Sequence, residues 1–187
     1  MNVPIEISAR HLHLSQEHME ILFGAGYALT PRRELSQKGY FVTQEKVEVI
    51  GEKASALFSI LIPLRKKTQV EMAVTDAKRL GVVPVLRISG HLEGSSPVKL
   101  KGPMGEINLT EGAIIAKRHI HMSSSQALNM GFFDGDEVLV KVENERGGIL
   151  DHVVITTSPT FNLTMHIDTD EGNAFGIGSA QGTIIKK

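Results

Sequence analysis

The sequence contains no cysteine, and this absence already limits the chemistry that the chain can perform. Without thiols there can be no disulfide framework and no metal site built from thiolates. Any zinc must therefore be held by imidazole and carboxylate groups, which are the ligands typical of catalytic sites rather than of closed structural ones. A covalent intermediate on a cysteine is excluded for the same reason.

Long apolar runs are also lacking, and neither sign of charge is in excess. The longest uncharged apolar stretch covers residues 54–64, far fewer than the roughly 20 residues that span a bilayer. Glu6 and Arg10 interrupt the N-terminus before the apolar region of a signal peptide could form. The 20 Lys and Arg residues balance the 21 Asp and Glu residues, which argues against nucleic acid or an anionic membrane as the main partner. We therefore expect a soluble, cytoplasmic protein.

The chain does have enough apolar sequence to build a core. Hydrophobic residues make up 41% and charged residues 22% of its 187 residues, as in an ordered protein of one domain or two small ones. Apolar residues alternate over residues 3–7, 47–49 and 138–142, and this period of two is typical of half-buried strands. Turns rich in glycine separate such stretches, which predicts a mainly β fold of small barrels or a sandwich.

Helices are expected to be few and short. Ser15 can cap a helix over residues 16–23, Asp76 can cap a second one, and Ser123 or Ser124 can begin a third. Each would be followed by a glycine that ends it. These helices would cover the ends of β structure rather than form a layer of their own.

One short motif occurs twice. Residues 10–15 read Arg-His-Leu-His-Leu-Ser, and residues 118–123 read Arg-His-Ile-His-Met-Ser. Each copy follows a strand-like run and precedes a helix with a serine cap. The recurrence of strand, His-x-His, cap and helix in the same order indicates two related halves.

The two His-x-His pairs predict a metal site. In a strand, residues two apart point to the same face, so His11 and His13 project together, as do His119 and His121. Two imidazoles on one face can bind one metal ion, and a third ligand from elsewhere completes an open site. A single pair would be explained by two exposed histidines on a strand, but two pairs in the same frame favour the metal hypothesis.

Candidates for further site residues are more isolated. His166 stands at a strand-like entry to the acidic stretch 168–171, and it could be a ligand or a hydrogen-bonded core histidine. Glu71 lies between apolar residues, so it could face the histidines or solvent. Arg65 follows an apolar run and suits bidentate phosphate binding, although a solvated basic turn is the alternative. The acidic stretch could orient the histidines or cap a helix.

Four segments together resemble one known family. Residues 7–15, 63–71, 116–123 and 165–174 are similar to motifs of the PduL-type phosphate acyltransferases, which are phosphotransacylases that act on acetyl- or propanoyl-CoA. The segments occur in the family's order and run through essentially the whole chain. One departure is Ile62, which stands where the family commonly has a glycine before Pro-Leu-Arg.

This resemblance implies a fold and a site. The fold would be two small β-barrels capped by short helices, with a dinuclear metal site, most commonly of zinc, between them. Residues 1–9 with 117–187 would form one barrel, and residues 10–116 the other. Arg65 would bind phosphate and serve as the catalytic residue. Six residues would be the metal ligands: His11, His13, Glu71, His119, His121 and His166.

The resemblance also implies a reaction and partners. A short acyl group would pass reversibly between CoA and inorganic phosphate, giving acyl phosphate and free CoA. Two alternatives stay open, namely a dinuclear metal hydrolase for a thioester or phosphoester and a metal-binding module without turnover. A homodimer is one option for the assembly. The extension that directs some family members into bacterial microcompartments is not seen, in keeping with a cytoplasmic location.

Overall fold

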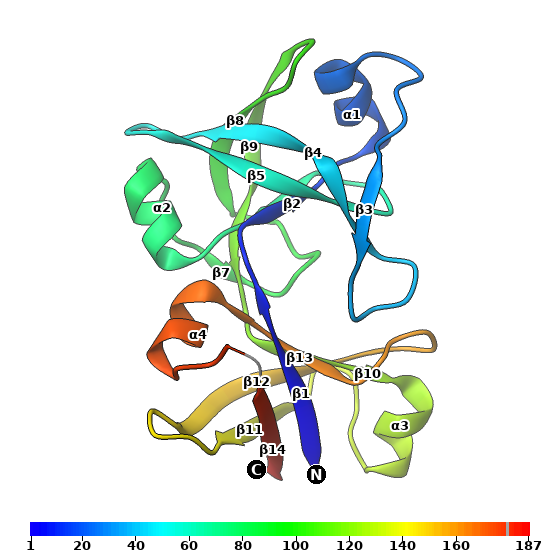
Figure 1. Cartoon of the computed structure of the whole chain (residues 1–187), viewed down its shortest axis with the longest axis vertical. Helices are drawn as coiled ribbons and strands as arrows, with labels where there is room; N and C mark the ends of the chain where they lie inside the picture. The colour runs from blue at the N-terminus through cyan, green and yellow to red at the C-terminus, as the bar shows by residue number, and fades with distance from the viewer. Residues whose placement is uncertain (179) are drawn as a thin grey trace. The chain divides into compact units, whose positions relative to one another are not determined.

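The computed structural model describes residues 1–178 and 180–187, and the fold is mainly β (Figure 1). The chain divides into two compact units. Unit 1 contains Met1–Ser8, Ser36–Lys38 and Lys117–Lys187, and unit 2 contains Ala9–Leu35 and Gly39–Ala116. Compared with the expected boundaries, Ala9 belongs to unit 2, and residues 36–38 join unit 1 although both flanking segments belong to unit 2.

Unit 1 is a closed six-stranded barrel. Its order around the barrel is β1 (Asn2–Ser8), β13 (Thr164–Asp168), β10 (His119–Ser123), β12 (Gly148–Ser158), β11 (Glu137–Val142) and β14 (Ala180–Lys186), and β14 pairs again with β1. Two short helices, α3 (Ser124–Asn129) and α4 (Thr169–Ala174), follow β10 and β13 directly. Closure gives each of the six strands a paired neighbour on both sides, and the barrel encloses one hydrophobic core.

Unit 2 also contains a closed ring of six paired strands. The ring is β4 (Phe41–Ile50), β5 (Ser55–Ile62), β2 (His11–His13), β6 (Gln69–Glu71), β9 (Glu106–Ala116) and β8 (Ser96–Lys101), and β8 pairs again with β4. Two further strands extend this sheet, β3 (Pro31–Glu34) beside β4 and β7 (Leu86–Arg87) beside β9. Its helices are α1 (Gln16–Phe23) and α2 (Val74–Leu80).

The two rings have the same topology. In each, the His-x-His strand pairs in parallel with a long strand, β5 or β12, and antiparallel with a short one, β6 or β13. The registers also agree, because His11 lies opposite Glu71 and His119 lies opposite His166. The structure therefore supports the interpretation of the repeated motif as two related halves.

The strand that precedes each His-x-His motif belongs to the other unit. β1 leads into β2 but pairs with β13 and β14 of unit 1, whereas β9 leads into β10 but pairs with β6 and β8 of unit 2. Each ring is thus completed by a strand from the other half of the sequence. This exchange explains why unit 1 contains both the N-terminal strand and the C-terminal third of the chain.

Helices α1 and α3 begin where the sequence predicts. The Ser15 hydroxyl accepts the N–H of His18 at 3.2 Å, and the Ser123 hydroxyl accepts the N–H of Gln126 at 3.1 Å. The Gln126 side chain bonds back to the N–H of Ser123, which completes a capping box. Each serine satisfies an N–H group that has no partner within its helix.

The predicted cap of the second helix is wrong. Helix α2 begins after Ala73, and Asp76 lies inside its first turn. The Asp76 carboxylate instead accepts a hydrogen bond from Arg10 Nη1 at 3.0 Å, so a tertiary ion pair uses the group that the sequence suggested as a cap. The helix ends as predicted at Gly81, whose φ of 78° is a left-handed conformation that favours glycine.

The residue between the paired histidines of unit 2 supports its core. Leu12 is fully buried among the apolar side chains of that ring. Replacing Leu12 by alanine should lower the free energy of unfolding by about 2 to 5 kcal/mol, because a cavity is added to the lost burial. Leu57→Ala is a matched control on the neighbouring strand, because Leu57 is 57% exposed, and its effect should stay below about 0.5 kcal/mol. Urea denaturation of both variants measures the difference, and equal losses would contradict the assignment.

In the part of the chain that the structure describes, no helix is both long enough and apolar enough to cross a membrane.

Candidate metal centres

The first candidate centre lies in unit 2 and consists of His11, His13 and Glu71. Each offers a ligand atom, and these atoms lie within 4.8 Å of one another. All three residues are buried, and His11 Nε2 lies 3.5 Å from Glu71 Oε2. Ligand atoms about 2.0 to 2.1 Å from a tetrahedral zinc ion are separated by about 3.3 Å, so this spacing fits two ligands of one ion.

The second candidate centre lies in unit 1 and consists of His119, His121 and His166. Their ligand atoms also lie within 4.8 Å of one another, and the three residues are half-buried. The three imidazole rings are mutual neighbours, with centroid separations of 4.7, 4.8 and 5.2 Å. The structure therefore groups all six of the expected ligands into two sets of three, one in each unit.

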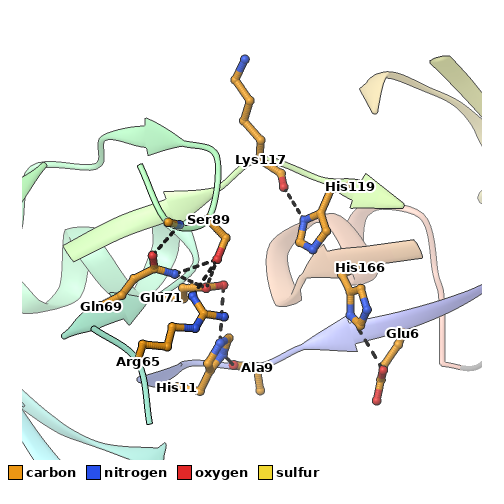
Figure 2. A network of polar contacts seen from close by, with 11 residues as sticks. Glu6, Ala9, His11, Arg65, Gln69, Glu71, Ser89, Lys117, His119 and His166 are labelled. Carbon is orange, nitrogen blue, oxygen red and sulfur yellow. Dashed lines mark hydrogen bonds and ion pairs between the residues drawn. The ribbon is translucent and has the colours of Figure 1, made fainter. Parts of the chain in front are cut away.

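The first histidine of each motif has the same supporting contact. Nδ1 of His11 lies 2.9 Å from the carbonyl oxygen of Ala9, and Nδ1 of His119 lies 2.8 Å from the carbonyl oxygen of Lys117 (Figure 2). A carbonyl oxygen can only accept, so Nδ1 carries the proton in both rings. In the neutral form of each ring Nε2 then keeps its lone pair, as in metal-binding histidines whose other ring nitrogen donates to a carbonyl or carboxylate oxygen.

The protonation states in unit 2 also fit a metal. Burial sets the pKa of His13 well below its usual value, and the charges of Arg65 and His11 act in the same direction, so the ring is neutral. His13 Nδ1 is buried and has no hydrogen-bond partner among the residues that the structure describes. Burial would raise the pKa of Glu71, but the charge and hydrogen bond of His11 outweigh it and hold that pKa well below its usual value. A neutral imidazole and an ionised carboxylate are the forms that bind zinc.

The pKa of His11 moves in the opposite direction. Burial alone would lower it, but the charge and hydrogen bond of Glu71 outweigh burial and raise it. The negative carboxylate thus attracts a positive charge at the position of His11 Nε2. A divalent cation between these two side chains would be stabilised by the same negative charge. The donor set and its charges therefore fit a metal ion.

Arg65 lies beside this first centre. It follows β5, and its backbone N–H donates to the carbonyl of Leu14 at 2.9 Å. Its Nη1 donates to Ser89 Oγ at 3.1 Å (Figure 2). Burial lowers the pKa of Arg65, and the Glu71 charge opposes that effect. Arg65 is half-buried, whereas Lys66 and Lys67 are exposed, so the solvated-turn interpretation applies to the two lysines only.

Two residues that the sequence analysis did not single out, Gln69 and Ser89, join Arg65 and Glu71 in a network of hydrogen bonds. Gln69 and Ser89 both contact Glu71 Oε1, at 2.5 and 3.1 Å. Gln69 could have been found, because it lies two residues before Glu71 on a strand and so shares its face. Ser89 comes from the segment after β7, and no local pattern links that segment to β6.

A third residue that sequence reasoning missed is Glu6, which lies beside the second centre. Its Oε2 is 3.8 Å from His166 Nδ1 (Figure 2). The same oxygen accepts a hydrogen bond from the Ser36 hydroxyl at 2.5 Å. Glu6 and His166 are direct partners in the parallel pairing of β1 with β13. Gln37, next to Ser36, exchanges two hydrogen bonds with the backbone of Asn162. These contacts hold the segment 36–38 within unit 1.

The arginine before each histidine pair forms an equivalent ion pair. Arg10 reaches Asp76 in the first turn of α2, and Arg118 Nε lies 3.0 Å from Glu171 in the first turn of α4. Glu171 also forms a capping box with Asp168, in which each side chain accepts the other's backbone N–H. The capping interpretation of the acidic stretch is therefore confirmed for these two residues.

The remaining histidines lie outside both centres. His91 and His152 are exposed. His18 is half-buried, and its Nδ1 lies 2.8 Å from Thr68 Oγ1. Thr68 also accepts the backbone N–H of Ser15, so His18 belongs to the structure around the start of α1.

Comparison with known proteins identifies relatives over nearly the whole chain. A family model described as phosphate propanoyltransferase matches residues 4–178. A phosphate propanoyltransferase of Lachnoclostridium phytofermentans is 49% identical over 96% of this chain and 84% of its own length. Proteins of the same name from Thermotoga maritima and Listeria monocytogenes are 48% and 43% identical over 91% and 99% of this chain, and over 82% and 88% of their own lengths. On this evidence, the chain belongs to the phosphate propanoyltransferase family, a family of phosphate acyltransferase enzymes.

Proposed function

We propose that this enzyme transfers a short acyl group, acetyl or propanoyl, between CoA and inorganic phosphate in a reversible reaction. Family membership supports the phosphate acyltransferase class. The observation that carries the proposal is the position of Arg65, whose guanidinium is joined through Ser89 to the carboxylate of Glu71. A cation suited to phosphate thus stands beside a set of metal-binding side chains.

We propose two divalent metal ions as cofactors, with zinc as the preferred metal. His11, His13 and Glu71 would hold one ion, and His119, His121 and His166 would hold the other. Three protein ligands per ion leave coordination positions open for substrate, as in catalytic zinc sites. When bound, such ions polarise an acyl carbonyl and stabilise negative charge on phosphate oxygens or on a leaving thiolate.

Phosphate is the nucleophile of the proposed reaction, and residues of unit 2 would bind and orient it. Arg65 would bind the phosphate dianion through its planar fork and orient one oxygen toward the acyl carbon. A phosphate oxygen then forms a bond to that carbon, the carbon–sulfur bond breaks, and CoA leaves as a thiolate. Direct transfer is favoured over an acyl-enzyme, because the chain has no cysteine and the hydroxyl of Ser89 is engaged with three side chains.

Release of free CoA tests this proposal. Protein of measured metal content is mixed with acetyl-CoA or propanoyl-CoA, with and without phosphate, and the thiol released is followed over time. Phosphate-dependent release with formation of acyl phosphate is the expected result, and the ratio of the two rates gives the preferred acyl group. Release at the same rate without phosphate would instead support a hydrolase. No release from fully metallated protein would support a binding module.

A further inference from the structure

We propose that Ser89 and Gln69 are positioning residues that hold the Glu71 carboxylate and the Arg65 guanidinium as one rigid group. This inference rests on the proposed function and deepens it, because it assigns how the phosphate-binding group is fixed to a metal-ligating one. It is carried by the hydrogen bonds that join these four side chains (Figure 2).

The hydroxyl of Ser89 is used to its full capacity. It accepts from Arg65 Nη1 at 3.1 Å and from Gln69 Nε2 at 2.9 Å, and it donates to Glu71 Oε1 at 3.1 Å. A serine hydroxyl has one proton and two lone pairs, so these three contacts account for all of them. Glu71 as a carboxylate can only accept, which fixes the direction of the serine proton. Ser89 thus connects the cation to the carboxylate.

The amide of Gln69 uses both of its N–H donors and accepts one hydrogen bond on its oxygen. Its Nε2 donates to Glu71 Oε1 and to Ser89 Oγ, and its Oε1 accepts the backbone N–H of Gly90 at 2.7 Å. The contact with Gly90 fixes which end of the amide carries the donors. Gly90 has a φ of 94°, a conformation that favours glycine, and this turn places Ser89 and Gly90 against β6. Gln69 itself is 1% exposed.

The consequence for Glu71 is that its two oxygens have different roles. Oε1 receives two hydrogen bonds, from Gln69 and Ser89, whereas Oε2 is the oxygen that lies 3.5 Å from His11 Nε2. The network therefore presents one oxygen to the centre and holds the other away from it. Binding through one oxygen leaves more of the coordination sphere for substrate than binding through both.

The described part of unit 1 does not repeat this arrangement. The residue that pairs with His121 is Thr164, at the register position that Gln69 holds opposite His13 in unit 2. A threonine has one O–H donor, so it cannot join two acceptors as the Gln69 amide does. The network accordingly distinguishes the two related halves, and it marks unit 2 as the side that binds phosphate.

The test compares Ser89→Ala with Ser89→Thr, which keeps the hydroxyl, and with Ser124→Ala, an exposed serine outside the network. Ser89→Ala should raise the KM for phosphate by about 10- to 100-fold, the loss expected for a hydrogen bond to a charged group. Its KM for acyl-CoA should change by less than about twofold. Ser89→Thr should recover most of the phosphate KM, and Ser124→Ala should match the wild type.

A second readout does not depend on turnover. Metal retained by each purified variant is measured during titration with a chelator, together with Gln69→Met, which keeps the bulk but removes both donors. Ser89→Ala and Gln69→Met should lose one of two ions at about tenfold lower chelator, as for other partners that orient metal ligands. Unchanged retention and unchanged phosphate KM, or an equal rise of both KM values, would overturn the inference. If the wild type shows no phosphate-dependent release, the proposed function fails, and the chelator titration still decides whether this network positions Glu71.

Discussion

Replacing His119 by alanine is expected to remove one metal ion and almost all activity. His119 belongs to the half-buried three-histidine set of unit 1, where its ring lies 4.7 Å from His121 and 5.2 Å from His166. With two ligands left, the site should lose its ion during purification. The loss of several kcal/mol of transition-state stabilisation corresponds to a rate at least about 10³-fold lower. Metal content per chain should fall from two to one.

The control for this variant is a histidine outside both centres. His152 is exposed and has a φ of 53°, so His152→Asn is the appropriate change, because asparagine tolerates this backbone conformation. It should retain both ions and the wild-type rate. A His119→Ala protein with two bound ions and normal turnover would remove His119 from the set of ligands. Elemental analysis and the CoA-release assay on the same samples distinguish these results.

Replacing Arg65 by alanine should mainly impair the use of phosphate. The guanidinium is half-buried beside Glu71, and no other cation of the described residues contacts Ser89 in its place. The KM for phosphate should rise by about 10²-fold or more, in line with the loss of a charge-assisted contact of about 3 kcal/mol. The KM for acyl-CoA should change little, and both metal ions should stay bound.

Arg65→Lys is the informative companion to this variant. Lysine keeps the charge but lacks the planar fork, so it should recover only part of the affinity for phosphate. If Arg65→Ala instead loses metal, the arginine supports the centre rather than the nucleophile. If its phosphate KM equals that of the wild type, Arg65 is not the phosphate-binding residue. Steady-state kinetics with phosphate varied at saturating acyl-CoA make this comparison.

Local sequence was sufficient for features that depend on neighbours along the chain. Alternating apolar residues predicted strands, and the serines before α1 and α3 predicted their first turns. The His-x-His pairs predicted shared strand faces for the same reason, since a period of two is a property of a single strand. The prediction that Asp76 caps α2 failed because a distant partner, Arg10, binds its carboxylate.

The sequence by itself thus determined the β-rich class of the fold, the repeated motif and the chemical type of the candidate metal ligands, imidazole and carboxylate. Only the tertiary structure decided which partners meet: Glu71 opposite His11, His166 opposite His119, and Ser89 between Arg65 and Glu71. Strand register and the exchange of β1 and β9 between the rings bring these residues together. Pairing between strands joins residues far apart in the chain, and no local period encodes it.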